Sequence, residues 1–222
     1  MWNVTIIRKF VTMEKTHTHI EKGLSKKKDG ELIFSTDFRG SGTEDAIRKA
    51  LSRLTYTGQV KRLAHGIYYK PKVDPILGEL RPGADEVVKM LAQKEKIKVR
   101  PAGAYALHRL GLTTQVPTKL VYITNGHSKQ FKLGKLQIKF KATSPKKLET
   151  IGEISSLLIQ ALEEIGTENI DPITEKKILE LLIKEDLRKL KHDLSLAPAK
   201  VNDYIVKLLK KQENDRVAEV NR

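Results

Sequence analysis

The segment GSGTEDAIRKALSRLTYTGQVKRLAHGIYYKP, residues 40–71, carries side chains suited to binding a polyanion. Apolar residues recur at Ile47, Ala50, Leu51 and Leu54, and this spacing predicts a helix with one buried stripe. The opposite face and the helix start hold the candidate DNA contacts: Ser41, Thr43, Arg48, Lys49, Ser52, Arg53 and Tyr56. Arg and Lys can hydrogen-bond to guanine edges in the major groove. The pattern therefore favours a helix that reads a base sequence.

A short β-hairpin is predicted directly after this helix. Two β-prone runs, residues 60–63 and 67–69, flank His65 and Gly66, which is the composition of a tight turn. The hairpin carries Lys61, Arg62, His65 and Lys70, for which we expect contacts with backbone phosphates. A helix followed by a basic hairpin is the recognition half of a winged helix-turn-helix, which lays the helix in the major groove.

The turn before the helix has two interpretations. Ser41 and Glu44 form a capping-box pattern that places the helix start at Ser41. Gly40 and Gly42 would either expose backbone N–H groups to a DNA phosphate or simply permit a turn with positive φ. Asp45 could accept a hydrogen bond from cytosine, although an acid in the first helical turn is also favoured by the helix dipole. The whole segment could also be a solvated amphipathic helix beside an ordinary hairpin.

The upstream residues predict the remainder of the same domain. Residues 4–11 are β-prone and are assigned to an N-terminal extension covering residues 1–15. A first helix over 16–24, a short strand over 31–34 and a short helix from Ser35 complete a winged helix at 16–72. Its expected core is Phe34, Phe38, Ile47, Leu51, Leu54, Val60, Leu63 and Ile67.

Two further regions follow, so the predicted fold class is α+β. Residues 71–82, which contain three prolines, are expected to be a linker into a mixed α/β domain over 73–145. Strands over 119–124, 129–133 and 135–142 alternate apolar residues with Lys, which indicates a sheet with one wet, basic face. Residues 146–222 predict a helical C-terminal region in which 212–222 fray.

Charge and composition narrow the possible functions. The 222 residues carry a net charge of +15; residues 1–72 hold 15 Lys and Arg against 7 Asp and Glu, and residues 73–145 hold 13 against 5. The last 77 residues are nearly balanced, so the polyanion-binding surface is expected in the first two thirds. With no cysteine and no membrane-length apolar run, a cytoplasmic location is the default expectation.

Catalytic chemistry finds little support in the sequence. No phosphate-binding loop, serine elbow, HExxH or dinucleotide fingerprint is present. The acidic residues at 163–164, 168 and 185–186 fall on predicted helical surfaces without a paired base, which favours solvated faces. We therefore expect no enzyme, no cofactor and no metal site.

Three segments, DFRGSG with the helix and hairpin that follow, PAGAYALHRLGLTTQVP and VYITNG, resemble the AbiEi-like antitoxin and transcriptional-regulator family of abortive-infection operons. The resemblance runs from about residue 20 to about 198, and the segment from Pro101 to Pro117 is its most specific part. It implies an N-terminal winged helix that represses its own promoter, with residues 43–57 as recognition helix and 60–69 as wing. It also implies antitoxin activity against a nucleotidyltransferase-like toxin, which in type IV systems need not be contacted directly.

The alternative class is a non-catalytic module whose winged helix binds RNA or an acidic protein partner. A fold of this kind does not fix its ligand, because winged helices also serve as interaction platforms. The operator sequence, the toxin and the oligomeric state stay open at this point.

Overall fold

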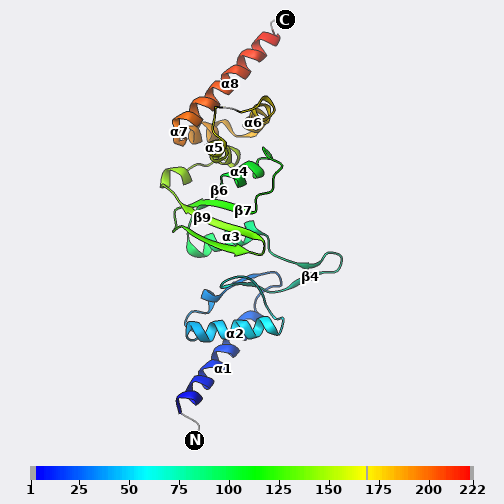
Figure 1. The fold of residues 1–222 in the computed structure, drawn as a ribbon, viewed down its shortest axis with the longest axis vertical. Coiled ribbons are helices and arrows are strands. Elements are labelled where there is room, and N and C mark those ends of the chain that lie inside the picture. Colours follow the sequence, from blue (N-terminus) through cyan, green and yellow to red (C-terminus); the bar gives the residue numbers. More distant parts are fainter. Residues whose placement is uncertain (1–3, 169, 221–222) are drawn as a thin grey trace. The chain divides into compact units, whose positions relative to one another are not determined.

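The computed structural model describes residues 4–168 and 170–220, with side chains described for 15–168 and 170–214. Over these residues the protein is a mixed α/β protein with three sheets (Figure 1). The described chain divides into two compact units. Unit 1 comprises residues 1–91 and 131–134, and unit 2 comprises 92–130 and 135–222. This division does not coincide with the boundaries near 72 and 145 that the sequence indicates.

Unit 1 is built on two packed helices and a three-stranded sheet. In chain order it contains α1 (Val4–Ser25), β1 (Leu32–Phe34), the 3-10 helix η1 (Ser35–Phe38), α2 (Glu44–Tyr56), β2 (Lys61–Ala64) and β3 (Ile67–Tyr69). The sheet order is β1-β3-β2, with β3 antiparallel to both neighbours. Figure 1 shows α2 crossing the C-terminal part of α1, and one apolar cluster joins both helices to the sheet.

The expected core of unit 1 is confirmed except at one residue. Leu51 and Val60 are fully buried, and Leu54 is nearly so. Leu63 is only half-buried, because β2 carries a register shift between Arg62 and Ala64 that places Ala64 inward instead. The core also includes Ile20 and Leu24 of α1.

The start of α2 lies two residues later than the capping-box pattern suggested. Thr43 is the N-cap, and its Oγ1 accepts a hydrogen bond from the backbone N–H of Ala46 at 3.2 Å. Ser41 instead offers its carbonyl oxygen to Thr16 Oγ1 of α1, at 2.9 Å. A Cβ on Gly42 would come within 2.3 Å of Thr16 Oγ1, so this glycine is required by close packing against α1.

The β-prone reading of residues 4–11 is wrong. From Val4 onward these residues form the first turns of α1, which continues without interruption to Ser25. The proposed extension over 1–15 is therefore part of a helix from residue 4, and residues 1–3 lie outside the described residues. Intrinsic β-propensity is a weak preference that a continuing helix readily overrides.

The predicted linker over 71–82 is largely a second hairpin. Strands β4 (Lys72–Asp74) and β5 (Gly78–Leu80) pair antiparallel, and the Asp74 carboxylate accepts hydrogen bonds from the N–H groups of Ile76 and Leu77. Glu79 of β5 accepts hydrogen bonds from Lys61 Nζ and Tyr69 Oη. These contacts attach the second hairpin to the β2–β3 hairpin.

A four-stranded sheet has most of its residues in unit 2, and helix α3 (Ala84–Glu95), of which residues 84–91 belong to unit 1, precedes its first strand. The strands are β6 (Val99–Ala102), β7 (Lys119–Thr124), β8 (Lys129–Leu133) and β9 (Leu136–Ala142), in the order β6-β7-β9-β8. β6 pairs antiparallel and β9 parallel with β7. Ile138 and Phe140 are fully buried while Lys139 and Lys141 are not, which confirms the predicted alternation.

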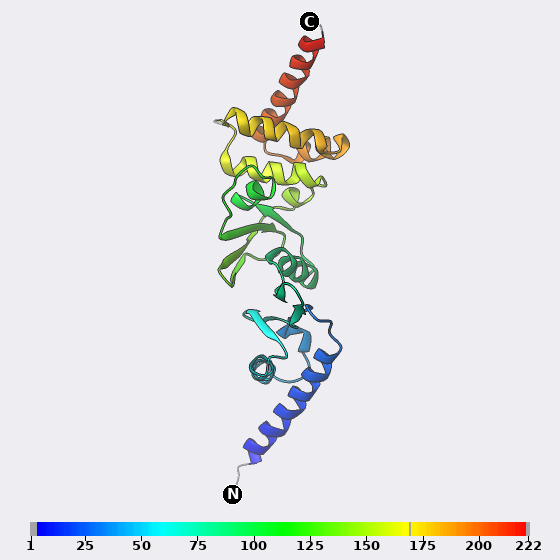
Figure 2. The ribbon, with the colours of Figure 1, turned by 90° about the vertical axis from the view of Figure 1, so that its right-hand side faces the viewer.

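Helix α5 (Glu153–Ile165) forms the centre of the remaining structure. It contacts β6 and the short helix α4 (Ala104–Arg109) and also packs against α6 (Pro172–Lys184), α7 (Leu187–Leu196) and α8 (Ala199–Val220), as Figure 2 shows. A second 3-10 helix, η2 (Pro145–Leu148), precedes it. α8 continues to Val220, so fraying from residue 212 is not observed up to that residue, and residues 221–222 lie outside the described residues.

Two carboxylates from distant segments cap the N-terminus of α5. Glu185 Oε2 accepts hydrogen bonds from the N–H groups of Ile154 and Ser155, at 2.8 and 2.9 Å. Asp193, which is fully buried, accepts from the N–H groups of Ile151 and Gly152. The prediction that residues 185–186 form a solvated acidic face is wrong for Glu185, which is committed to this cap; Asp186 is itself the N-cap of α7.

Candidate nucleic-acid interface

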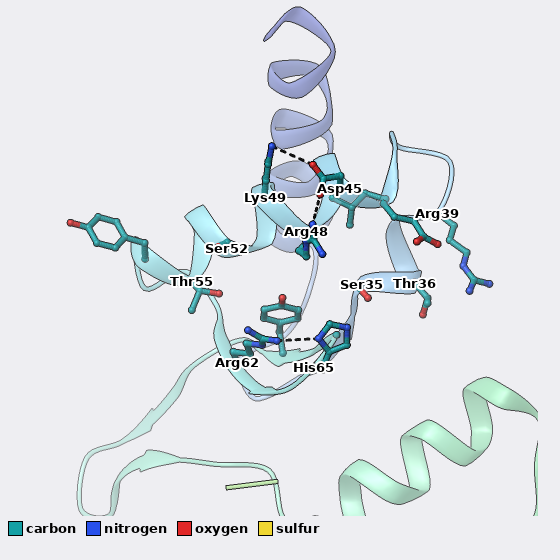
Figure 3. A pocket seen from close by; sticks show the side chains of 15 residues that line it. Ser35, Thr36, Arg39, Asp45, Arg48, Lys49, Ser52, Thr55, Arg62 and His65 are labelled. Carbon is teal, nitrogen blue, oxygen red and sulfur yellow. Dashed lines mark hydrogen bonds and ion pairs between the residues drawn. The ribbon is translucent and has the colours of Figure 1, made fainter. Parts of the chain in front are cut away.

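A groove of about 920 Å³ separates the outer face of α2 from the β2–β3 hairpin, and it lies entirely within unit 1 (Figure 3). It is lined by residues from η1, the following turn, α2 and the hairpin. Six of the predicted contacts meet there: Arg48, Lys49, Ser52, Tyr56, Arg62 and His65. Its charged lining comprises four cations, Arg39, Arg48, Lys49 and Arg62, and two acids, Glu44 and Asp45.

The helical side of the groove is organised by Asp45. Its carboxylate accepts a hydrogen bond from Arg48 Nη2 and forms an ion pair with Lys49 Nζ at 3.3 Å (Figure 3). These partners, Lys49 foremost, lower the pKa of Asp45 below its ordinary value despite slight desolvation. At least half of each side chain is solvent-exposed, so both cations are accessible to a ligand.

The hairpin side is organised around Arg62 and His65. Arg62 Nη2 lies 3.3 Å from His65 Nδ1, and Arg62 Nε donates to the carbonyl oxygen of Ala64 at 3.3 Å. These contacts hold the guanidinium at the hairpin turn, where Figure 3 shows it facing the helix residue Arg48 across the groove. A planar guanidinium held in place suits the bidentate recognition of a phosphate.

Tyr56 and Ser52 extend the polar surface toward the C-terminal end of α2. Tyr56 is 95% exposed, which is exceptional for an aromatic side chain, and it leaves the hydroxyl and ring free for a partner. Ser52 is exposed one turn earlier on the same face. Ile47 and Tyr68 also line the groove, and both side chains are buried.

The remaining predicted contacts do not line the groove. Lys61 Nζ donates to Glu79 on the second hairpin, and Lys70 Nζ donates to the Lys27 carbonyl oxygen at 2.9 Å and pairs with Asp29 at 3.2 Å. Because side chains alternate along a strand, Lys61 faces away from its neighbour Arg62. The hypothesis that Lys61 and Lys70 contact phosphate beside Arg62 is therefore not supported by their placement.

Three more predicted contacts, at the start of α2 or on it, also lie outside the groove lining. Thr43 caps the helix, and the Ser41 carbonyl oxygen binds Thr16. Arg53 is exposed on α2 outside the groove lining.

Sequence reasoning missed Arg39 and Thr36, which line the groove from η1 and the turn after it. Both side chains are exposed, and they lie beside the N-terminal turn of α2 in Figure 3. The sequence signal that could have identified Arg39 is its position in the turn before α2. A cation in that turn lies close to any ligand that contacts the helix.

The described fold is a mixed α/β architecture with a basic groove on its N-terminal unit. The chain belongs to DUF6088, a family of unknown function, whose model matches residues 19–190. That range includes the whole groove and unit 2 up to the middle of α7. No curated protein matches the chain. None of the described helices combines the length and apolarity needed to span a bilayer.

Proposed function

We propose that unit 1 is a winged helix-turn-helix that binds double-stranded DNA, with α2 in the major groove and the β2–β3 hairpin on the flanking backbone. The observation that carries the proposal is the gathering of Arg39, Arg48, Lys49 and Arg62 from three separate segments around one groove. Cations that only keep a protein in solution need not cluster, because like charges repel one another.

The winged-helix interpretation is supported by element order and pairing. A helix, a short strand, a short helix, a longer helix and a hairpin follow one another, and the first strand pairs with the second hairpin strand. The longer helix, α2, buries one stripe on α1 and leaves its other face exposed. This is the arrangement expected of a recognition helix beside a wing.

Roles divide by position around the groove. Lys49 and Ser52 lie on the exposed face of α2, where they would meet base edges, and Arg48 can serve either bases or phosphates. Arg62 and Arg39 flank the helix and would neutralise phosphates, which sets affinity and register more than sequence preference. Asp45 pairs with Arg48 and Lys49, and DNA phosphates would compete with it for these cations.

The biological setting that we propose is repression of the protein's own operon together with antitoxin activity. This part rests on the resemblance to AbiEi-like regulators and on the basic character of the first two thirds of the chain. A nucleotidyltransferase-like toxin encoded beside this gene would be the functional partner.

The test is a gel shift with a duplex from upstream of the gene and a shuffled duplex of the same composition. Wild-type protein should prefer the upstream duplex, and Lys49→Ala should reduce that preference, since one lost base contact typically costs about 1–3 kcal/mol of discrimination. Lys61→Ala is the matched control and should behave as wild type, because Lys61 pairs with Glu79. No shift of either duplex at low salt would refute the proposal.

A further inference from the structure

Unit 2 contains a second cleft, of about 750 Å³, with no part in the proposed DNA contact. It lies between the β6–β7–β9 sheet, helix α5 and the loop over 113–118. That loop is the end of the segment PAGAYALHRLGLTTQVP, so the most distinctive stretch of the sequence forms a wall of the cleft. A volume of this size suits a small organic ligand.

Gln160 of α5 is the first observation that points to a ligand. It lines the cleft, yet it is only 6% exposed. Its side-chain amide is not among the fully enclosed polar groups that lack a partner in the described residues, so it reaches the open space of the cleft. A ligand with both a donor and an acceptor could replace water on this amide.

Two lysines provide the second observation. Lys119 at the start of β7 and Lys141 near the end of β9 both line the cleft, are exposed, and form no ion pair with a described residue. Lys119 of β7 pairs with Gln137 of β9 in the parallel register, and Lys141 follows Gln137 by four residues along β9. The two lysines therefore lie about 13 Å apart in the direction of the strands. A third lysine, Lys147, is neutralised by Glu163 at 2.6 Å.

Part of the cleft lining between these groups is apolar, and Thr118, Thr143 and Glu164 also line the cleft. Leu107, Val121 and Ile123 line the cleft, and Val116 of the loop is 72% exposed beside them. An apolar wall next to a buried amide and within reach of a free cation matches three parts of one ligand: a flat ring, a hydrogen-bonding edge and an anionic group.

We propose that this cleft binds a nucleoside phosphate, with the edge of the base on Gln160, the ring against the apolar wall and a phosphate on Lys141 or Lys119. Glutamine amides bond well to the donor and acceptor edge of a base. The nucleoside phosphate is either a free nucleotide or the terminal nucleotide of a nucleic-acid strand. The proposal is independent of DNA binding by unit 1, because all of its residues belong to unit 2.

The experiment is calorimetric titration of the full chain with the four ribonucleoside triphosphates, inorganic triphosphate, and short oligonucleotides with and without a terminal phosphate. At least one nucleotide or phosphorylated strand end should bind saturably. Gln160→Leu should weaken that binding at least about tenfold, and Lys141→Ala several-fold. Lys135→Ala is the matched control, because Lys135 is exposed at the β8–β9 turn and does not line the cleft.

The outcomes separate the two sources of the ligand. Tight binding of free nucleotides identifies a nucleotide site, whereas binding only of phosphorylated oligonucleotides identifies a strand-end site. The proposal is overturned if nothing binds below about 1 mM, if inorganic triphosphate binds as tightly as the nucleotides, or if the variants bind like wild type. Should Gln160→Leu fail to fold, the Lys119→Ala and Lys141→Ala double variant decides by the same criterion.

Discussion

Replacing Asp193 with asparagine is expected to destabilise unit 2 strongly. The Asp193 side chain is completely buried, and four donors converge on it. Oδ1 accepts from the N–H of Ile151 at 2.7 Å and lies 3.0 Å from His192 Nδ1. Oδ2 accepts from the N–H of Gly152 at 2.9 Å and from Ser155 Oγ at 2.6 Å. A single carboxylate thus connects α7 to the start of α5.

The magnitude follows from what asparagine can replace. Its oxygen can keep the bond to Ile151, but its NH₂ group then faces the N–H of Gly152, which is left buried and unsatisfied at a cost of about 1–3 kcal/mol. The remaining bonds lose their charge-assisted strength, since bonds to a charged group contribute about 1.5–3 kcal/mol against about 1 for neutral ones. The expected loss is about 3 kcal/mol, which corresponds to a decrease in Tm of about 6–12 °C for a chain of this size.

The assay is thermal and urea unfolding followed by circular dichroism, with Asp203→Asn as the matched control. Asp203 lies exposed on α8, so its replacement should change stability by less than about 0.5 kcal/mol. If Asp193→Asn unfolds within 1 °C of wild type, Asp193 does not hold α5 and α7 together as we infer.

Three further predictions use the same structure. Burial raises the pKa of Asp193, but hydrogen bonds from His192, Ser155 and the backbone outweigh burial, so the folded pKa is lowered. The contribution of Asp193 to stability is therefore complete above the unfolded pKa of about 4 and is lost as pH falls through the lowered folded pKa. Acid titration should show a shallower loss of stability in Asp193→Asn than in wild type. Gly42→Ala should destabilise unit 1 by about 1–3 kcal/mol in urea unfolding, because its Cβ would lie 2.3 Å from Thr16 Oγ1. Asp45→Asn should tighten binding to unrelated DNA in a gel shift at low salt, since it removes a charge that competes with phosphate for Arg48; weaker binding would show that Asp45 orders these cations for DNA.

Local periodicity made α2 and its neighbouring hairpin predictable. Ile47, Leu51 and Leu54 fall at helical spacing, and the exposed face follows from the same geometry. The turn residues His65 and Gly66 then indicated where the strands reverse. These features depend on neighbours within a few positions, which the sequence displays directly.

The features that were missed depend on residues far apart in the chain. The second hairpin was predicted as a linker because its proline and glycine residues resemble those of loops, whereas its attachment comes from Glu79 bonding to Lys61, 18 residues away. The same bond turns Lys61 away from the groove. Glu185 caps α5 from 30 residues away, which no local pattern reveals. The helical path of residues 4–11 was missed because β-branched residues outweighed the continuity of α1 in a short window.

The salt dependence of DNA binding tests the central claim most directly. Fluorescence anisotropy of a labelled upstream duplex gives log K against log salt for wild type and for the Arg39→Ala, Arg48→Ala, Arg62→Ala triple variant. If all three side chains contact phosphate, the slope should become shallower by about 2–3, since each neutralised phosphate contributes about 0.9. The Lys61→Ala, Lys70→Ala double variant should keep the wild-type slope, because both lysines are paired outside the groove. An unchanged slope in the triple variant, or a change confined to the double variant, would contradict DNA binding through the α2 groove.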